Sequence, residues 1–129
     1  MKPQIREEMI AYFIQIDQIE DVMPIYEEIL SMEQYESKKP KSQYEKELCE
    51  LISQFPEKCH KMSSNPVDFL RKTIEKDQNG ETWTHLAEFF IRQGQFGLAR
   101  DIFEESIQNG VKTVRDFTIV FNSYVKFEQ

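Results

Sequence analysis

Residues 82–107 (TWTHLAEFFIRQGQFGLARDIFEESI) are the stretch that most constrains what this chain can fold into. Their apolar residues form two runs at helical spacing, one before and one after a short break at Gly94. Glycine tolerates the left-handed backbone conformation in which helices commonly end. A break this short leaves two adjacent helices antiparallel and packed on each other, so the stretch predicts a helical hairpin.

The hairpin belongs to a repeating pattern. Its packing positions match, in type and spacing, the large and small packing residues of tetratricopeptide repeats. A shift of 77 positions places Arg6 on Trp83 and the run from Ile25 to Glu28 on the run from Ile102 to Glu105. A shift of 34 positions places the segment after residue 113 on the first helix of the hairpin. The residues predicted to pack the repeats are Trp83, Leu86, Ala87, Phe90, Ala99, Phe103, Phe117, Phe121 and Tyr124.

These repeats predict an all-α fold, a superhelix of about seven helices built as a single array. The predicted repeats are 3–33, 42–79 and 81–109, followed by a half repeat at 113–129. Since no partner helix follows the half repeat, we expect the chain to be a fragment of a longer array. Local signals mark the helix ends. They are Ser42 with Glu45 and Thr113 with Asp116 as caps, Asn65-Pro66 as a start, and Asn79-Gly80 and Asn109-Gly110 as stops.

Composition and charge exclude several classes of protein. A content of only 4 glycines and 5 prolines in 129 residues argues against a turn-rich all-β fold. The net charge of -7 disfavours direct binding to nucleic acid, whose phosphates such a surface repels. No apolar run approaches the ~20 residues of a membrane span, and no signal peptide opens the chain. Two cysteines form no disulfide framework, which fits a reducing cytosolic or nuclear setting.

The sequence contains no signature of catalysis, of a metal site or of a cofactor. Cys49, Cys59, His60 and His85 lack the paired spacings of a structural zinc site. No nucleophile stands in a recognisable triad context, so we expect no enzyme activity. The acidic residues of the repeats are expected on solvated helix faces, with Arg100 pairing with Glu104 one helical turn away. These acidic residues are Glu27, Glu28, Asp101, Glu104 and Glu105.

Residues 86–107 (LAEFFIRQGQFGLARDIFEESI) and 113–129 (TVRDFTIVFNSYVKFEQ) resemble half-a-tetratricopeptide (HAT) repeats. They are most similar to the Syf-type pre-mRNA splicing factors, known in animals as XPA-binding protein two. The segment ELCELISQFPEK at 47–58 also resembles this family, so the resemblance covers most of 44–129, and residues 1–43 match only as a degenerate helix pair. The resemblance implies a nuclear, non-enzymatic scaffold that holds other splicing proteins in a spliceosome-associated Nineteen-type complex.

The aromatic stripe of residues 113–129 is the surface predicted to bind a partner, through Phe117, Tyr124 and Phe127. In a longer array this stripe, which includes Phe121, would be covered by the next helix. Exposed apolar patches drive association, so we expect this chain to self-associate. The basic cluster at Lys38, Lys39 and Lys41 is expected to be a solvated loop.

Two other functions remain as alternatives. The first is a co-chaperone or adaptor of the tetratricopeptide class that binds peptide termini. Such proteins need Lys, Arg and Asn side chains that project together, whereas Arg6, Lys46 and Arg92 are scattered here. The second is an RNA-binding helical repeat, which the acidic charge disfavours.

Overall fold

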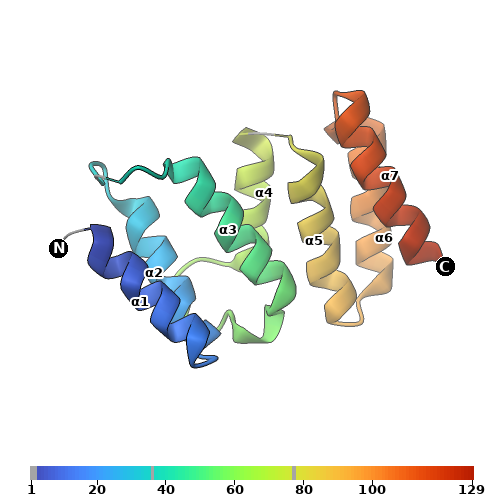
Figure 1. Ribbon diagram of the computed structural model, residues 1–129. Coiled ribbons are helices and arrows are strands. Elements are labelled where there is room, and N and C mark those ends of the chain that lie inside the picture. The colour runs from blue at the N-terminus through green and yellow to red at the C-terminus, as the bar shows by residue number, and fades with distance from the viewer. Residues whose placement is uncertain (1–2, 36, 77) are drawn as a thin grey trace. The chain divides into compact units, whose positions relative to one another are not determined.

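The structure is a computed structural model, which describes residues 3–35, 37–76 and 78–129 (Figure 1). Those ranges hold seven α-helices and no strand, which confirms the prediction of an all-α helical-repeat fold. None of the described helices is long and apolar enough to cross a membrane. The helices are α1 (Pro3–Gln15), α2 (Ile19–Ser31), α3 (Lys41–Gln54), α4 (Pro66–Lys76), α5 (Gly80–Arg92), α6 (Phe96–Glu105) and α7 (Val114–Glu128).

The helices divide into two compact units, Met1–Asn65 and Pro66–Gln129. The first unit contains α1, α2 and α3, followed by a 3-10 turn at Pro56–Lys58. The second contains α4 to α7, with a π-helical turn at Ser106–Gly110 between α6 and α7. The division falls inside the predicted repeat 42–79, so the two helices of that repeat lie in different units. The arrangement of all the repeats as a single array stays a prediction.

In the first unit, α2 packs against both α1 and α3. Val22, Met23 and Ile29 of α2 are fully buried with Leu48 and Ile52 of α3, because both helices carry apolar residues three and four positions apart.

Helix α1 does not bury the apolar residues that recur along it at helical spacing. The apolar run at Ile5, Met9, Tyr12 and Ile16 is largely exposed. Among the side chains of α1 that the structure describes, the buried ones are Ile10 and Arg6, which lie one helical turn apart and share a face. The Arg6 guanidinium is 5% exposed and donates to Glu28 of α2 at 2.6 Å. Hydrophobic spacing alone could not find this face, since its centre is a charged residue.

In the second unit, the predicted hairpin is formed by α5 and α6 (Figure 1). The chain reverses at Gly94, whose φ of 76° lies in the left-handed region that glycine enters without steric cost. Helix α5 also packs against α4 and α7, so it lies at the centre of this unit.

The helix ends agree with the sequence at some caps and differ at others. Thr113 caps α7 as predicted, since its hydroxyl accepts the Asp116 backbone N–H at 3.1 Å. The capping box at Ser42 and Glu45 was wrong, because α3 already begins at Lys41 after Pro40 and no side chain caps it. Asn79 does not end α4, which stops at Lys76. Its side chain instead caps α5 by accepting the Glu81 N–H at 2.7 Å.

Candidate functional site

Helix α7 carries apolar residues on two faces, and its inner face packs on the hairpin. Val120 is fully buried there. The ring of Tyr124 stacks on Phe103 with the centroids 5.0 Å apart, and Phe127 lies 5.5 Å from the same ring. Arg100 of α6 stabilises the end of this face, because it lies over the Phe127 ring and pairs with Glu128 at 2.9 Å.

The outer face of α7 consists of Val114, Phe117, Phe121 and Val125, which follow one another at helical spacing. Phe117 and Phe121 stack on each other at 5.7 Å, yet they remain 41% and 47% exposed. Val114 is 83% exposed. A contiguous apolar strip of this kind is a candidate surface for protein–protein contact.

The structure therefore separates the three residues predicted to bind a partner. Phe117 lies on the outer face, whereas Tyr124 and Phe127 lie on the inner face and are half-buried. All three fit one broad apolar stripe in the sequence. The signal that distinguishes the two sides is the small Val120, which allows α7 to approach the hairpin closely. Partner binding by Phe117, Tyr124 and Phe127 remains a prediction.

The residues predicted to pack the repeats differ in how far they are buried from solvent. Trp83, Leu86, Ala87, Ala99 and Phe103 are buried. Phe90 is half-buried, and its neighbour Phe89 is the more deeply buried of the pair, with the rings edge to face at 5.6 Å. Phe117 and Phe121 are exposed and Tyr124 is half-buried.

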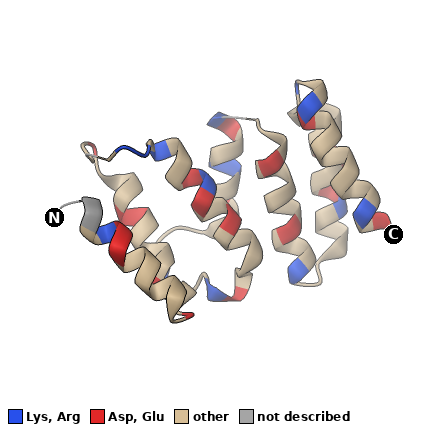
Figure 2. Ribbon diagram, in the orientation of Figure 1, with Lys and Arg blue, Asp and Glu red and all other residues tan. Residues whose placement is uncertain are grey.

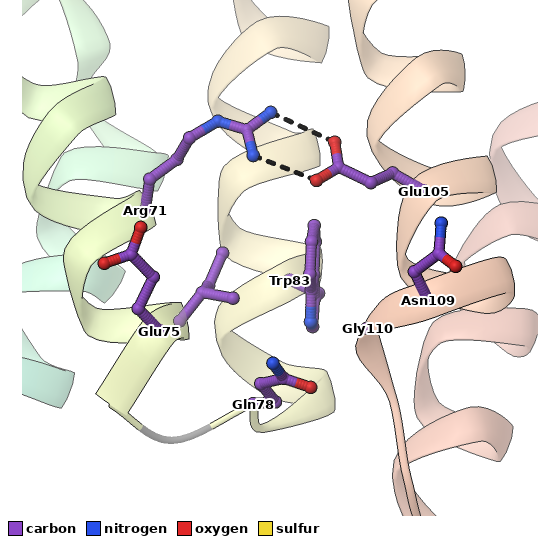
Figure 3. A pocket seen from close by; sticks show the side chains of 8 residues that line it. Arg71, Glu75, Gln78, Trp83, Glu105, Asn109 and Gly110 are labelled. Atoms are coloured by element: carbon purple, nitrogen blue, oxygen red, sulfur yellow. Dashed lines mark hydrogen bonds and ion pairs between the residues drawn. The ribbon is translucent and has the colours of Figure 1, made fainter.

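A second candidate site is a cavity of about 200 Å³ beside Trp83 in the second unit (Figure 3). Arg71 of α4 and Glu105 of α6 lie at its edge and form a bidentate ion pair, with both N–O distances 3.1 Å. Glu75, Gln78 and Asn109 also line the cavity. The sequence alone does not reveal this site, because its polar residues come from separate segments and match no motif.

Several of the carboxylates predicted to be solvated make tertiary contacts while they remain at least partly exposed to solvent. Glu28 pairs with Arg6, and Glu105 pairs with Arg71. Glu104 accepts the Tyr124 hydroxyl at 3.2 Å. Arg100 forms its ion pair with Glu128, so the predicted pairing of Arg100 with Glu104 was wrong. These pairs join residues at least 20 positions apart in the sequence, which helix periodicity cannot reveal.

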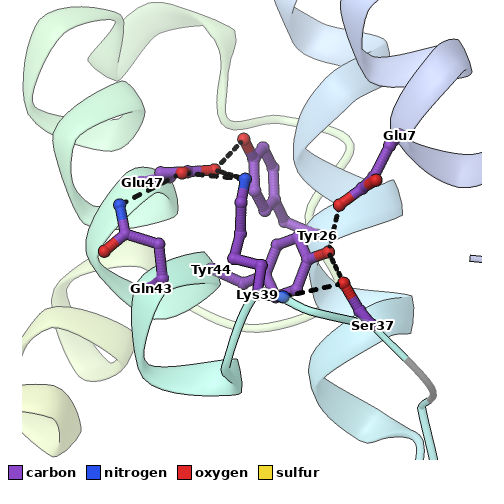
Figure 4. Close-up of polar contacts among 7 residues, drawn as sticks. All are labelled: Glu7, Tyr26, Ser37, Lys39, Gln43, Tyr44 and Glu47. Carbon is purple, nitrogen blue, oxygen red and sulfur yellow. Dashed lines mark hydrogen bonds and ion pairs between the residues drawn. The ribbon is translucent and has the colours of Figure 1, made fainter. Parts of the chain in front are cut away.

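Polar side chains also tie α1, α2 and α3 together in the first unit (Figure 4). The Tyr26 hydroxyl donates to Glu47 at 2.9 Å, and the Tyr44 hydroxyl donates to Glu7. Burial and the neighbouring carboxylate raise the pKa of both tyrosines, so both stay protonated at neutral pH. Lys39 donates to both Glu47 oxygens at 2.9 Å and lies over the Tyr44 ring. This lysine therefore belongs to a tertiary contact, not to a simple solvated loop.

The arrangement offers no assembled centre for chemistry in the parts of the chain that the structure describes. Those residues include no group of three or more His, Cys, Asp or Glu side chains that could hold a metal ion. Burial and then Glu57 raise the pKa of the Cys59 thiol to about 11, so it is not a nucleophilic thiolate at neutral pH. Figure 2 shows acidic and basic residues interspersed along the helices.

Comparison with known proteins identifies the family. The family model described as the pre-mRNA-splicing factor SYF1 middle HAT repeat matches residues 6–129. The chain is 39% identical to the human pre-mRNA-splicing factor SYF1 over 131 aligned residues, which is 100% of this chain and 15% of that protein. It is 38% identical to the Drosophila melanogaster homologue and 35% identical to the Dictyostelium discoideum protein. These alignments cover 98% and 99% of this chain, and 14% and 15% of those relatives.

The chain thus spans about 15% of the length of the curated relatives it matches. The match begins at residue 6, so it includes the helix pair α1–α2, which by repeat comparison alone is a degenerate copy. The same span contains the outer face of α7 and the cavity beside Trp83. With nearly its whole length matched, the chain belongs to the SYF1 middle HAT-repeat family of pre-mRNA splicing factors.

Proposed function

We propose that this chain is part of a protein–protein interaction scaffold in pre-mRNA splicing. It would act in the nucleus as a segment of a spliceosome-associated Nineteen-type complex. The names of its relatives in human, Drosophila melanogaster and Dictyostelium discoideum, each a pre-mRNA-splicing factor, support the process. The observation that supports a scaffold is the outer face of α7, where Phe117 and Phe121 expose apolar rings. Such a face gains free energy when a protein surface covers it.

The same features support a non-catalytic role. A helical repeat presents long surfaces built by many similar elements, and such surfaces bind proteins without forming a chemical centre. The net charge of -7 supports protein partners over a phosphate backbone. The partners proposed are other splicing proteins of the complex.

The test uses the full-length protein that carries this chain, in nuclear extract. Deletion of residues 1–129 and the double substitution Phe117→Ser with Phe121→Ser are each compared with the unchanged protein by affinity capture and mass spectrometry. Asn122→Ser is the matched control, because it changes an exposed polar residue of the same helix. The proposal is supported if the deletion and the double variant both lose splicing proteins while the Asn122→Ser control retains them. Recovery of chaperones in place of splicing proteins would favour the co-chaperone alternative.

A further inference from the structure

The cavity beside Trp83 contains two buried polar atoms of opposite character that lack partners. The Trp83 side chain is 4% exposed, and its indole N–H donates to no described group. The side-chain oxygen of Gln78 is also buried and accepts no hydrogen bond from a described group. Buried polar groups are nearly always satisfied in folded proteins. A donor and an acceptor that line one cavity therefore point to a group that can serve both.

The two side chains line the same cavity. Figure 3 shows the nitrogen-bearing end of the Trp83 ring directed toward the Gln78 side chain. The ring cannot turn away freely, because Gly110 lies against it so closely that a Cβ there would come within 2.5 Å of the indole. A volume of about 200 Å³ exceeds by several times the roughly 30 Å³ that one water occupies. The cavity therefore has room for a side-chain end group.

The charged residues at the edge of the cavity indicate which charge a bound group should carry. Arg71 and Glu105 satisfy each other through two hydrogen bonds, so neither offers its full charge to a ligand. Glu75 is exposed, and no ion pair joins it to another described residue. The rim thus holds one negative charge without a counter-charge. It would attract a basic group beside the inserted one and repel an acidic one.

We propose that this cavity binds the carboxamide side chain of an asparagine or glutamine in a partner polypeptide, with a neighbouring basic residue facing Glu75. The carboxamide oxygen accepts from the Trp83 indole N–H, and its amide N–H donates to the Gln78 oxygen. A carboxylate could not donate to Gln78, and an ammonium or guanidinium could not accept from Trp83. The inference deepens the scaffold role and rests on it, since it supplies a contact for a protein partner.

A polypeptide is favoured over RNA as the source of this group. A nucleobase edge also combines donors and acceptors, but its phosphates would meet Glu75 and the acidic chain as a whole.

The experiment uses the single tryptophan of the chain as its reporter. The indole N–H resonance of Trp83 in the full 129-residue chain is followed by NMR during titration with acetyl-lysyl-glutaminyl-glycine methylamide. We expect a saturable shift with a dissociation constant of millimolar order, as suits one inserted side chain. The same peptide with norleucine or glutamate in place of glutamine should bind at least tenfold more weakly. Replacing its lysine with glutamate should weaken binding severalfold.

Matched variants separate the cavity from the rest of the chain. Gln78→Leu replaces the carboxamide by an apolar side chain of similar size and removes the acceptor, so binding should fall at least tenfold. Gln108→Leu is the control, because Gln108 is exposed and does not line the cavity. Retained helical circular dichroism shows that the variants are folded.

Three outcomes would overturn the proposal. They are no saturable shift, equal binding of the norleucine peptide, and a shift produced by a random RNA hexanucleotide but not by the peptide. The first means that the cavity holds solvent only. Failure here is distinguishable from failure of the scaffold role, because capture of splicing proteins is measured separately with the α7 variants.

Discussion

At the scale of single residues, the position of Trp83 depends on the absence of a side chain at Gly110. A Cβ built at residue 110 would lie 2.5 Å from Cζ2 and 2.7 Å from Nε1 of the indole. Gly110→Ala must therefore displace a buried ring, and overpacking of this kind costs about 1–3 kcal/mol. We expect the variant to lose that much stability in urea unfolding and to shift the Trp83 fluorescence spectrum of the folded state.

Gly97→Ala is the control for this substitution. A Cβ at residue 97 meets nothing within 4 Å, and the residue lies inside α6. Since alanine is the better helix former, this variant should gain about 0.5–1 kcal/mol. If both variants lost the same stability, the close contact at Gly110 would not be the cause.

The environment of Arg6 shows which features of single residues the sequence could predict and which it could not. Repeat spacing placed Arg6 at the position of Trp83, and the structure buries both side chains. Spacing could not predict how the charge of Arg6 is accommodated there, because its ion-pair partner Glu28 belongs to the next helix. The equivalent residues Glu28 and Glu105 both pair with an arginine, but Arg71 comes from outside the hairpin. Long-range partners of this kind leave no periodic trace.

At the scale of elements, Asp116 joins the first turns of two helices. One of its carboxylate oxygens accepts the Gly80 N–H at the start of α5, at 3.1 Å. The other accepts the Thr113 hydroxyl at 2.9 Å at the start of α7. Asp116→Ala should cost about 1–2 kcal/mol, because it leaves the start of α5 without this acceptor and weakens the cap of α7.

Thermal unfolding followed by circular dichroism measures this loss. Asp101→Ala provides the comparison, since Asp101 is an exposed residue of α6. That variant should be unchanged or slightly more stable. An Asp116→Ala chain as stable as the Asp101→Ala chain would show that the link between α5 and α7 contributes nothing.

Glu27 of α2 fixes the loop that precedes α4 at the end of the first unit. Its carboxylate accepts the backbone N–H groups of Ser63 and Ser64 at 2.8 and 3.0 Å, and both hydroxyls as well. Burial raises the pKa of Glu27, but these hydrogen bonds together outweigh burial and lower it below the usual 4.5. The stabilisation is therefore fully present above pH 4.5 and is lost as the pH falls through the folded-state pKa.

Glu27→Gln should accordingly cost about 1 kcal/mol at pH 7, which is less than the usual ~1.5–3 kcal/mol for hydrogen bonds to a charged group because the site is partly exposed. The difference from the unchanged chain should shrink as the pH falls below 4.5. Urea unfolding at a series of pH values measures it. Glu33→Gln, at an exposed position, should show neither effect. A difference independent of pH would rule out the carboxylate as its source.

The presence of each helix could be predicted from the sequence, whereas the positions of the helix ends could be predicted less well. Apolar spacing carries the signal for each helix along its whole length, whereas a cap depends on one or two side chains. Thr113 keeps its predicted role because α7 begins at Val114, directly after it. Ser42 does not, because α3 begins one residue earlier and Ser42 lies inside the helix. Asn79 was assigned to the wrong helix, since an Asn-Gly pair suits a helix stop as well as a start.

At the scale of the whole molecule, periodicity predicted repeats but not packing units. The pattern treats 42–79 as one repeat, yet Asn65 and Pro66 belong to different compact units. Periodicity reports which residues can share a helix face, and says nothing of how many helices share a core. The two faces of α7 illustrate this. Its aromatic residues look alike in sequence, and only the packing of Val120 against the hairpin decides which of them face outward.

The outer face of α7 leads to a prediction for the chain in solution. Phe117 and Phe121 present stacked, exposed rings flanked by Val114 and Val125. Pairing two such faces removes apolar surface from water at about 25 cal/mol per Å², against the cost of bringing two molecules together. We expect reversible self-association of the 129-residue chain that grows with concentration in sedimentation velocity.

The response to salt and to substitution identifies the surface responsible. Apolar association should persist at 1 M salt, where the screening length falls to about 3 Å and attraction between the charged side chains largely disappears. Phe117→Ser combined with Phe121→Ser should yield a monomer at concentrations where the Asn122→Ser chain still associates. Association that disappears in salt but survives the double substitution would assign it to charged surfaces instead. A chain that stays monomeric at high concentration would show that its exposed phenylalanines are too few to hold a second copy.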